Sequence, residues 1–230
     1  MPKCSYDNNL GVIAKDFRKK DTNYTKGYFI LNDYFNDYLK MWTHNDRENN
    51  RNFNNLENIW DSLDYRYKFL DNKNIIVQNL FEQIINNIFL FDIFISNADR
   101  HFHNWEIVDE TNQIYLNQNY DNEDIFLKDY TIPELGVSKS TNNYDFYDTL
   151  KEFLKTTENQ YLEQVKNMYY ILAPDVIVKI FKLTEKRHNL VVPISLKKEI
   201  IEKYNIHYKK ISKVINEFIE KENKRIILHK

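Results

Sequence analysis

A run of polar and ionisable residues near the middle of the chain has the side chains that phosphoryl transfer requires. Asp99, His101 and Asn104 lie within six positions, and the pair Tyr120-Asp121 follows further along the chain. Transfer of the γ-phosphoryl group of ATP needs a carboxylate that orients the attacking hydroxyl, and oxygen ligands that hold Mg²⁺ against the phosphates. Asp99 can supply the carboxylate, and Asn104 with Asp121 can supply the ligands. The pattern therefore predicts phosphoryl transfer with ATP and Mg²⁺.

The elements around this run would bring its two parts together. Residues 75–95 are apolar on more than one face, which predicts a buried helix. Trp105–Val108 alternates as a strand does, and Ile114–Leu116 is its expected hairpin partner. A hairpin returns the chain to the end where it started, so the loops before and after it should lie side by side. These loops carry the candidate residues.

The N-terminal part is expected to combine a small sheet with helices. Val12–Ala14 and Gly27–Ile30 look like short strands of one sheet or hairpin, and a helical period begins at Leu31. The segment 44–55 is polar and is expected to be a solvated loop, and a second helix follows from Leu56.

Four or five helices are expected after a loop that contains Pro133 and Gly136. Thr157-x-x-Gln160 resembles a capping box, and Pro174 suits the first turn of a helix. Apolar residues such as Ile177, Ile180 and Phe181 are assigned to core packing, and Lys209–Lys230 is a basic amphipathic helix docked on the body. The predicted fold class is mainly α (α+β), with a small β-hairpin that carries the catalytic loops.

Composition limits the classes of function. A chain of 230 residues with 42% apolar content is enough for one well-filled domain or two small lobes. The formal net charge of −2 gives no global attraction to nucleic acid or to an anionic membrane. The single cysteine, Cys4, excludes an internal disulfide and favours a reducing compartment, so a cytoplasmic location is expected. No apolar run suits a signal peptide or a membrane span.

The sequence Ser96-Asn97-Ala98-Asp99-Arg100-His101 with Asn104-Trp105, a hairpin and Tyr120-Asp121 resembles the catalytic core of HipA-like serine/threonine kinases, above all the CtkA-type branch. Val12–Phe17 resembles the strand that enters the family's hinge, and Tyr144-Asp145-Phe146 with the following helices resembles its helical C-lobe. The resemblance implies that Asp99 is the catalytic base, that Asn104 and Asp121 bind Mg²⁺, that His101 buttresses the loop, and that Arg100 pairs with a negative charge.

The resemblance divides the chain into residues 1–30, a remnant of the N-lobe strands and hinge, and residues 31–230, a kinase C-terminal lobe. It also shows two departures. The family's phosphate-covering loop and its lysine have no counterpart ahead of Val12, and the three glycines form no Gly-rich loop. The family usually has a small residue two positions after the aspartate that matches Asp121, but this chain has Asn122-Glu123-Asp124. The expected partners are a protein substrate and a second chain that supplies an N-lobe.

Other interpretations stay open at this stage. The chain could be a truncated pseudokinase that binds a partner, or a lipid kinase, since D-R-H-x-x-N also occurs in phosphoinositide kinases. His101-x-His103 with Asp99 and Asp121 could instead hold Zn²⁺ or Fe²⁺ in a phosphohydrolase. A purely structural role is also open, in which Asp99 caps a loop turn or the end of the buried helix, and Asn97 and Asn104 satisfy loop backbone groups. The other histidines (His44, His188, His207 and His229) are expected to be exposed, and family analogy also allows a secreted effector.

Overall fold

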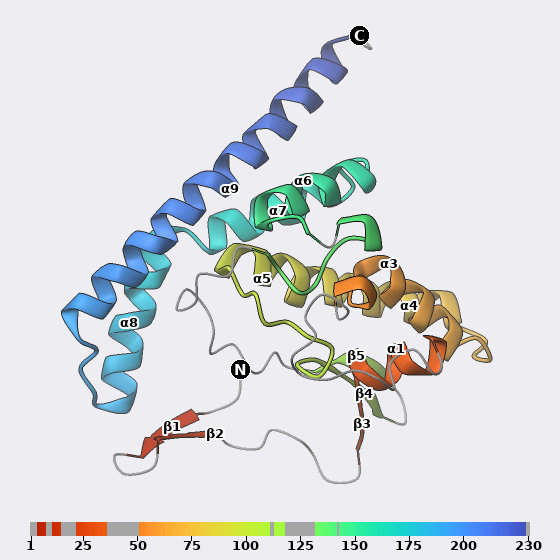
Figure 1. The fold of residues 1–230 in the computed structure, drawn as a ribbon, viewed down its shortest axis with the longest axis horizontal. Helices are drawn as coiled ribbons and strands as arrows, with labels where there is room; N and C mark the ends of the chain where they lie inside the picture. Colours follow the sequence, from red (N-terminus) through yellow and green to blue (C-terminus); the bar gives the residue numbers. More distant parts are fainter. Residues whose placement is uncertain are drawn as a thin grey trace.

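Helices form most of the computed structural model of this chain, and a small antiparallel sheet lies at one edge of them (Figure 1). The structure describes residues 4–7, 11–14, 22–35, 51–110, 113–117, 132–141 and 143–228. The mainly α prediction with a small sheet is confirmed. No helix in these described ranges is long and apolar enough to cross a membrane.

The sheet has the order β3-β4-β5 and is antiparallel throughout. Its strands are β3 (Asn23–Lys26), β4 (Glu106–Glu110) and β5 (Gln113–Leu116). The predicted hairpin is confirmed, with Ile107 opposite Leu116. Two further strands, β1 (Cys4–Asp7) and β2 (Gly11–Ala14), pair with each other in a separate hairpin. The expected strand near residue 12 is therefore present, but its partner is not the segment after Gly27.

The prediction of a strand at Gly27–Ile30 is wrong, because helix α1 (Gly27–Phe35) begins there. The β3 ladder ends at Lys26, and the next backbone N–H, that of Gly27, donates to the carbonyl of Trp105 at 3.0 Å. Gly27, Ile30 and Leu31 are all buried, which is the i, i+3, i+4 spacing of a helix rather than the alternation of a strand. Burial of one helical face decides the conformation.

A nearly continuous helix runs through the centre of the molecule, as the sequence predicts. It consists of α4 (Lys73–Ile84), a π-helical turn η2 (Ile85–Phe89) and α5 (Leu90–Ile95). Beside it, α3 (Leu56–Arg66) starts at Asn55, whose side chain accepts the N–H of Asn58. The solvated-loop prediction is wrong for the end of its segment. Residues 51–53 are helical, and Asn54 and Asn55 are fully buried.

Four helices form the C-terminal part: α6 (Phe146–Thr156), α7 (Leu162–Ile171), α8 (Pro174–His188) and α9 (Ile194–Leu228). Pro174 is in the first turn of α8, as predicted. Thr157 is not an N-cap. It ends α6, and its hydroxyl donates to the carbonyl of Phe153 at 2.7 Å. The core assignment of α8 is also wrong, because none of its residues is buried and Ile180 is 48% exposed.

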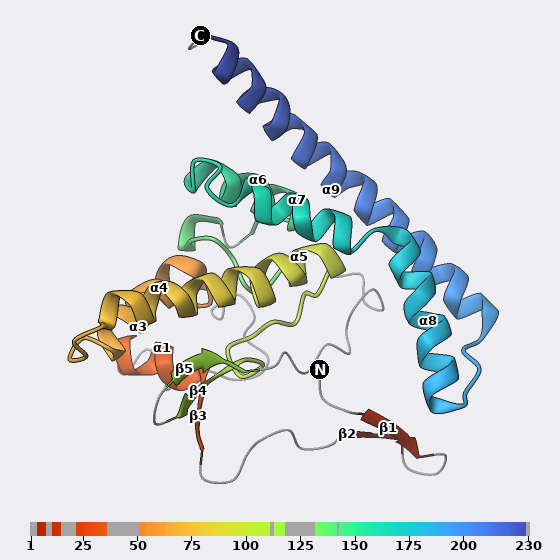
Figure 2. The same cartoon turned by 180° about the vertical axis from the view of Figure 1, so that it is seen from behind.

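The central helix separates two layers. The sheet lies on one side of it with α1, and α6 and α7 lie on the other, while α9 crosses the molecule diagonally with α8 beside it (Figures 1 and 2). The docking of α9 is confirmed, because Ile211, Val214, Ile215 and Phe218 are buried. His207 on α9 is buried as well, which corrects the expectation that it is exposed. His44 and His229 lie outside the described residues.

Candidate active site

The candidate loop begins where α5 ends. Ser96 adopts a left-handed conformation with φ of 56°, and the next N–H, that of Asn97, donates to the carbonyl of Asp92 at 2.9 Å. This arrangement closes the helix by satisfying a carbonyl of its last turn. The chain then turns away from the helix axis and reaches β4 through residues 97–105.

Arg100 holds the loop to the helix from the inside. Its guanidinium makes a bidentate pair with Asp92, with Nε 2.8 Å from Oδ2 and Nη2 3.1 Å from Oδ1, and Nη1 donates to the carbonyl of Asn104 at 2.7 Å. Both charged side chains are almost entirely buried. Burial raises the pKa of the Asp92 carboxyl, and the guanidinium of Arg100 and the amide of Asn97 oppose this rise. Arg100 therefore meets a negative charge, but that charge belongs to the protein core.

A second support comes from a distant part of the chain. The amide nitrogen of Asn54 donates to the carbonyl of Arg100 at 2.6 Å and lies 3.3 Å from the carbonyl of Glu134. The backbone of Asn54 in turn accepts the N–H of Gly136 at 3.1 Å. Asn54 thus connects the candidate loop to residues 134–136. Asn54 lies in the segment that sequence reasoning assigned to solvent, and no sequence signal marks it.

Asp99 and Asn104 are fixed relative to each other through the backbone. The amide of Asn104 donates to the carbonyl of Asp99 at 3.0 Å, and the N–H of Asp99 donates to the side-chain oxygen of Asn97 at 3.2 Å. Because Nδ2 of Asn104 is used as the donor, its Oδ1 is directed away from that bond. Within the described ranges this oxygen accepts no hydrogen bond. Asp99 is half-buried, whereas Asn97, Arg100 and Asn104 are buried.

His101 and His103 have different surroundings. His101 is buried, its Nδ1 accepts the N–H of His103 at 3.2 Å, and its carbonyl accepts the N–H of Asn104 at 2.9 Å. The ring of His103 stacks on Tyr28 of α1 at 4.8 Å and 14°. Among the residues that the structure describes, no group of three His, Cys, Asp or Glu side chains could hold a metal ion. Asp99, His101 and His103 therefore do not form a metal site among themselves.

Tyr120 and Asp121 lie outside the described residues, as do Asn122-Glu123-Asp124. The last described residue before them is Asn117, whose N–H donates to the carbonyl of Glu106 at 2.9 Å and whose amide donates to its carboxylate at 2.6 Å. Glu106 is the first residue of β4 and follows the candidate loop directly. The end of β5 therefore returns to the end of the sheet where Asp99 and Asn104 lie.

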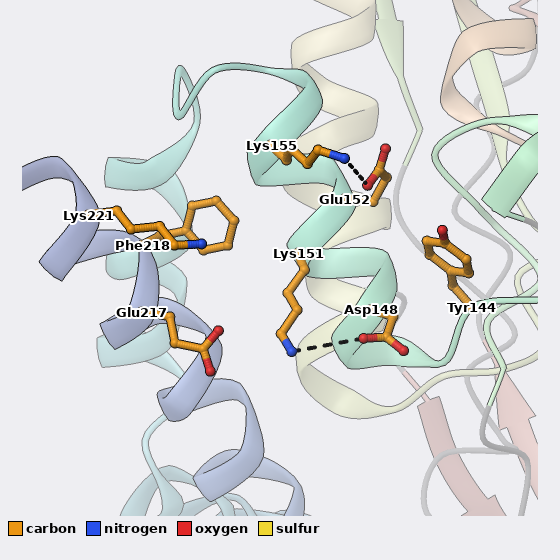
Figure 3. A pocket seen from close by; sticks show the side chains of 8 residues that line it. All are labelled: Tyr144, Asp148, Lys151, Glu152, Lys155, Glu217, Phe218 and Lys221. Atoms are coloured by element: carbon orange, nitrogen blue, oxygen red, sulfur yellow. Dashed lines mark hydrogen bonds and ion pairs between the residues drawn. The ribbon is translucent and has the colours of Figure 1, made fainter. Parts of the chain in front are cut away.

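A pocket between α6 and α9 lies apart from this loop (Figure 3). It has a volume of about 470 Å³. Lys151 lies 4.0 Å from Asp148, and Lys155 lies 3.4 Å from Glu152. Its three lysines face three acids, so the charges balance and give no preference for a phosphate. Its lining residues are Tyr144, Asp148, Lys151, Glu152, Lys155, Glu217, Phe218 and Lys221.

Comparison with known proteins gives a match of structure only. No protein-family model matches the chain, and no curated protein does. Among solved structures the chain is similar to the crystal structure of a Helicobacter pylori proinflammatory kinase, CtkA. The TM-score is 0.59 with 15% sequence identity, and the match covers 92% of this chain and 73% of that one. At this identity the likeness shows the fold and not the activity, so the conclusion is that the chain has a kinase-like, mainly α fold.

Proposed function

We propose that this chain is the C-terminal lobe of a HipA-like protein kinase that transfers the γ-phosphoryl group of ATP to a serine or threonine hydroxyl. One observation carries the proposal. Asp99 is a partly exposed residue of a loop in which Asn97, Arg100 and Asn104 are buried. A partly exposed carboxylate on an ordered loop can orient a hydroxyl. The kinase-like fold supports this interpretation.

Each candidate residue has a role in this reaction. Asp99 orients the acceptor hydroxyl and takes its proton while the oxygen bonds to the γ-phosphorus and ADP leaves. The side-chain oxygen of Asn104 is a hard ligand of the kind that Mg²⁺ prefers, and Asp121 would supply a second one. Bound Mg²⁺ would neutralise phosphate charge. His101 keeps the turn between Asp99 and Asn104 in shape through its two backbone contacts.

In this proposal, two chains supply different parts of the kinase. Residues 31–230 would form the catalytic lobe, and residues 1–30 would be a remnant of the N-lobe strands and hinge. The phosphate-covering part would come from a partner chain, and the acceptor would be a protein, with both in the cytoplasm. The binding-only alternative is a truncated pseudokinase, which would work equally well after Asp99→Ala.

The first test is Mg²⁺-dependent binding of ATP, measured by calorimetry with and without an added N-lobe. We expect binding to be lost in Asp121→Ala and weakened in Asn104→Ala, and to be kept in Asp99→Asn. Phosphoryl transfer by Asp99→Asn should fall by at least about 10²-fold, the usual contribution of a positioned base. Asp175→Asn removes a fully exposed carboxylate on α8 and serves as the control.

Three results would contradict the proposal. Absence of ATP binding by the wild-type chain in both conditions would favour the pseudokinase. Full transfer activity in Asp99→Asn would remove the assigned base. Phosphorylation of an inositol lipid rather than a protein would favour the lipid-kinase alternative.

A further inference from the structure

An apolar groove lies between α3, α6 and the start of the π-helical turn. It has a volume of about 320 Å³, which is at the lower end of the range for ligand pockets. Trp60 is 36% exposed there, and its ring packs edge-on against Phe81 at 5.0 Å. An accessible tryptophan in an apolar depression is typical of the centre of a protein interface. The apolar lining consists of Leu56, Trp60, Phe81, Ile85, Val137 and Phe153.

The two rims of the groove differ in charge. Glu57 and Asp61 line one side, four positions apart on α3, and both are exposed. Neither forms an ion pair within the described ranges, and like charges at this spacing destabilise a helix. On the other rim, the hydroxyls of Thr156 and Thr157 donate to carbonyls of α6 itself. The groove therefore suits an occupant that is apolar in the middle and basic at one side.

The floor of the groove contains a second unusual feature. Ile85, which lines it, is the first residue of the π-helical turn, and the N–H of Leu90 closes that turn on the carbonyl of Ile85. Single π-helical turns inside α-helices are rare and occur frequently at functional sites. This feature is independent of the charges on the rim.

The end of α9 has the matching chemistry. Phe218 is the last buried side chain described on this helix, and the last hydrogen bond to the body joins Asn159 to Glu222 at 2.8 Å. From Glu222 the helix continues to Leu228, a distance of about 9 Å at the normal helical rise. Figures 1 and 2 show this end projecting from the molecule. Residues 224–228 read Lys-Arg-Ile-Ile-Leu, with two cations followed by three aliphatic residues.

The helix end cannot fill the groove of its own chain. α9 is continuous from Ile194 to Leu228, and both views show its end pointing away from α3 and α4. We propose that the end of α9 in one copy docks into the groove of a second copy. Ile227 and Leu228 would cover Trp60. Lys224 and Arg225, one turn earlier on the same side of the helix, would face Glu57 and Asp61. This association does not depend on the proposed phosphoryl transfer.

Sedimentation velocity from about 1 µM to about 100 µM tests the proposal, a range in which contacts of moderate affinity are populated. We expect the wild-type chain to self-associate. The double variants Glu57→Lys/Asp61→Lys and Lys224→Glu/Arg225→Glu should each weaken association by at least about tenfold. In an equimolar mixture of the two variants, the groove of one and the helix end of the other regain opposite charges. Association should then return in the mixture.

The control is Asp175→Lys/Glu199→Lys, which makes the same charge change on α8 and the start of α9. It should associate as the wild type does. Unfolding curves of all variants confirm that they fold, since the described rim side chains are exposed. A wild-type chain that is monomeric throughout the series overturns the proposal. So does a mixture that fails to associate, or a control that weakens association as much as the groove variant does.

Discussion

The guanidinium of Arg100 is fully buried directly after the candidate base, although arginine is rarely buried without a partner. The sequence allowed the prediction that Arg100 meets a negative charge. It did not identify Asp92, although a carboxylate among the apolar residues 88–95 is a signal in itself, because a buried charge needs a counter-ion. The candidate loop is therefore supported by a side chain eight positions upstream.

Removal of one partner of this pair should be costly. Arg100→Met leaves the Asp92 carboxylate buried without its counter-charge, so we expect a loss of about 3–5 kcal/mol in the free energy of unfolding. Lys151→Met breaks the exposed pair of Lys151 and Asp148 (43% and 59% exposed) and should cost about 1 kcal/mol or less. Urea unfolding followed by circular dichroism measures both. If both substitutions lowered the free energy of unfolding equally, burial would not make the Asp92–Arg100 pair more costly to break.

His207 should make stability depend on acid pH. Its Nε2 lies 2.6 Å from the carbonyl of Ile93 and must donate to it, and its Nδ1 lies 2.9 Å from the hydroxyl of Tyr147, which can donate to a neutral ring. Burial lowers the pKa of His207 from 6.5 to about 4. In the unfolded chain the ring takes up a proton near pH 6.5, and in the folded chain it does so only near pH 4. Acidification between these values therefore favours unfolding.

We expect the wild-type chain to lose about 2–3 kcal/mol more stability than His207→Gln between pH 7 and pH 4.5. The difference should be absent above pH 7, where both states hold a neutral ring. Urea unfolding at several pH values gives the two curves. Parallel curves would mean that His207 is protonated in the folded protein without cost. The sequence analysis placed this histidine at the surface, although Tyr204 and Ile211 lie three positions before and four positions after it on the same helical face and are buried. Its hydrogen-bond partners on α5 and α6 are distant in sequence.

At the scale of elements, the long apolar pattern of residues 75–95 and the alternation of the hairpin strands predicted the elements that carry the candidate loop. The short N-terminal segments were harder. Gly27–Ile30 reads as a strand by composition, but burial of Ile30 and Leu31 against the body makes it the start of α1. The apparent capping box at Thr157 failed because the threonine hydroxyl bonds back to its own helix. The first miss comes from contacts with distant parts of the sequence, and the second from a local hydrogen bond that competes with the cap.

The junction of β3 and α1 should tolerate only glycine at position 27. A Cβ there would overlap the indole ring of Trp105, which is buried in the core. We expect Gly27→Ala to cost about 1–3 kcal/mol or more, as overpacking of a core does. Gly136→Ala is the control, because its nearest neighbours are at 3.8 Å and beyond. Thermal unfolding of the two variants should separate them clearly, and an equally stable pair would contradict the close contact with Trp105.

At the scale of the whole molecule, the chain has a kinase-like fold in which the 35-residue helix α9 crosses the other helices diagonally. The basic amphipathic segment at residues 209–230 predicted a docked helix, and the buried positions confirm it up to Phe218. Sequence could not show where docking stops, because the apolar residues near the end look like the buried ones. It also could not show that α8 is left with no buried residue.

Two truncations separate the docked part of α9 from its end. Removal of residues 211–230 deletes Ile211, Val214, Ile215 and Phe218, and each buried apolar side chain contributes about 1.5–3 kcal/mol. The sum is comparable to the roughly 5–15 kcal/mol that stabilises a domain, so this chain should fail to unfold cooperatively. Removal of residues 224–230 keeps all four of these buried side chains and the hydrogen bond from Asn159 to Glu222. Its free energy of unfolding should stay within about 1 kcal/mol of the wild type. A large loss from the shorter truncation would show that the end of α9 stabilises its own chain rather than projecting from it.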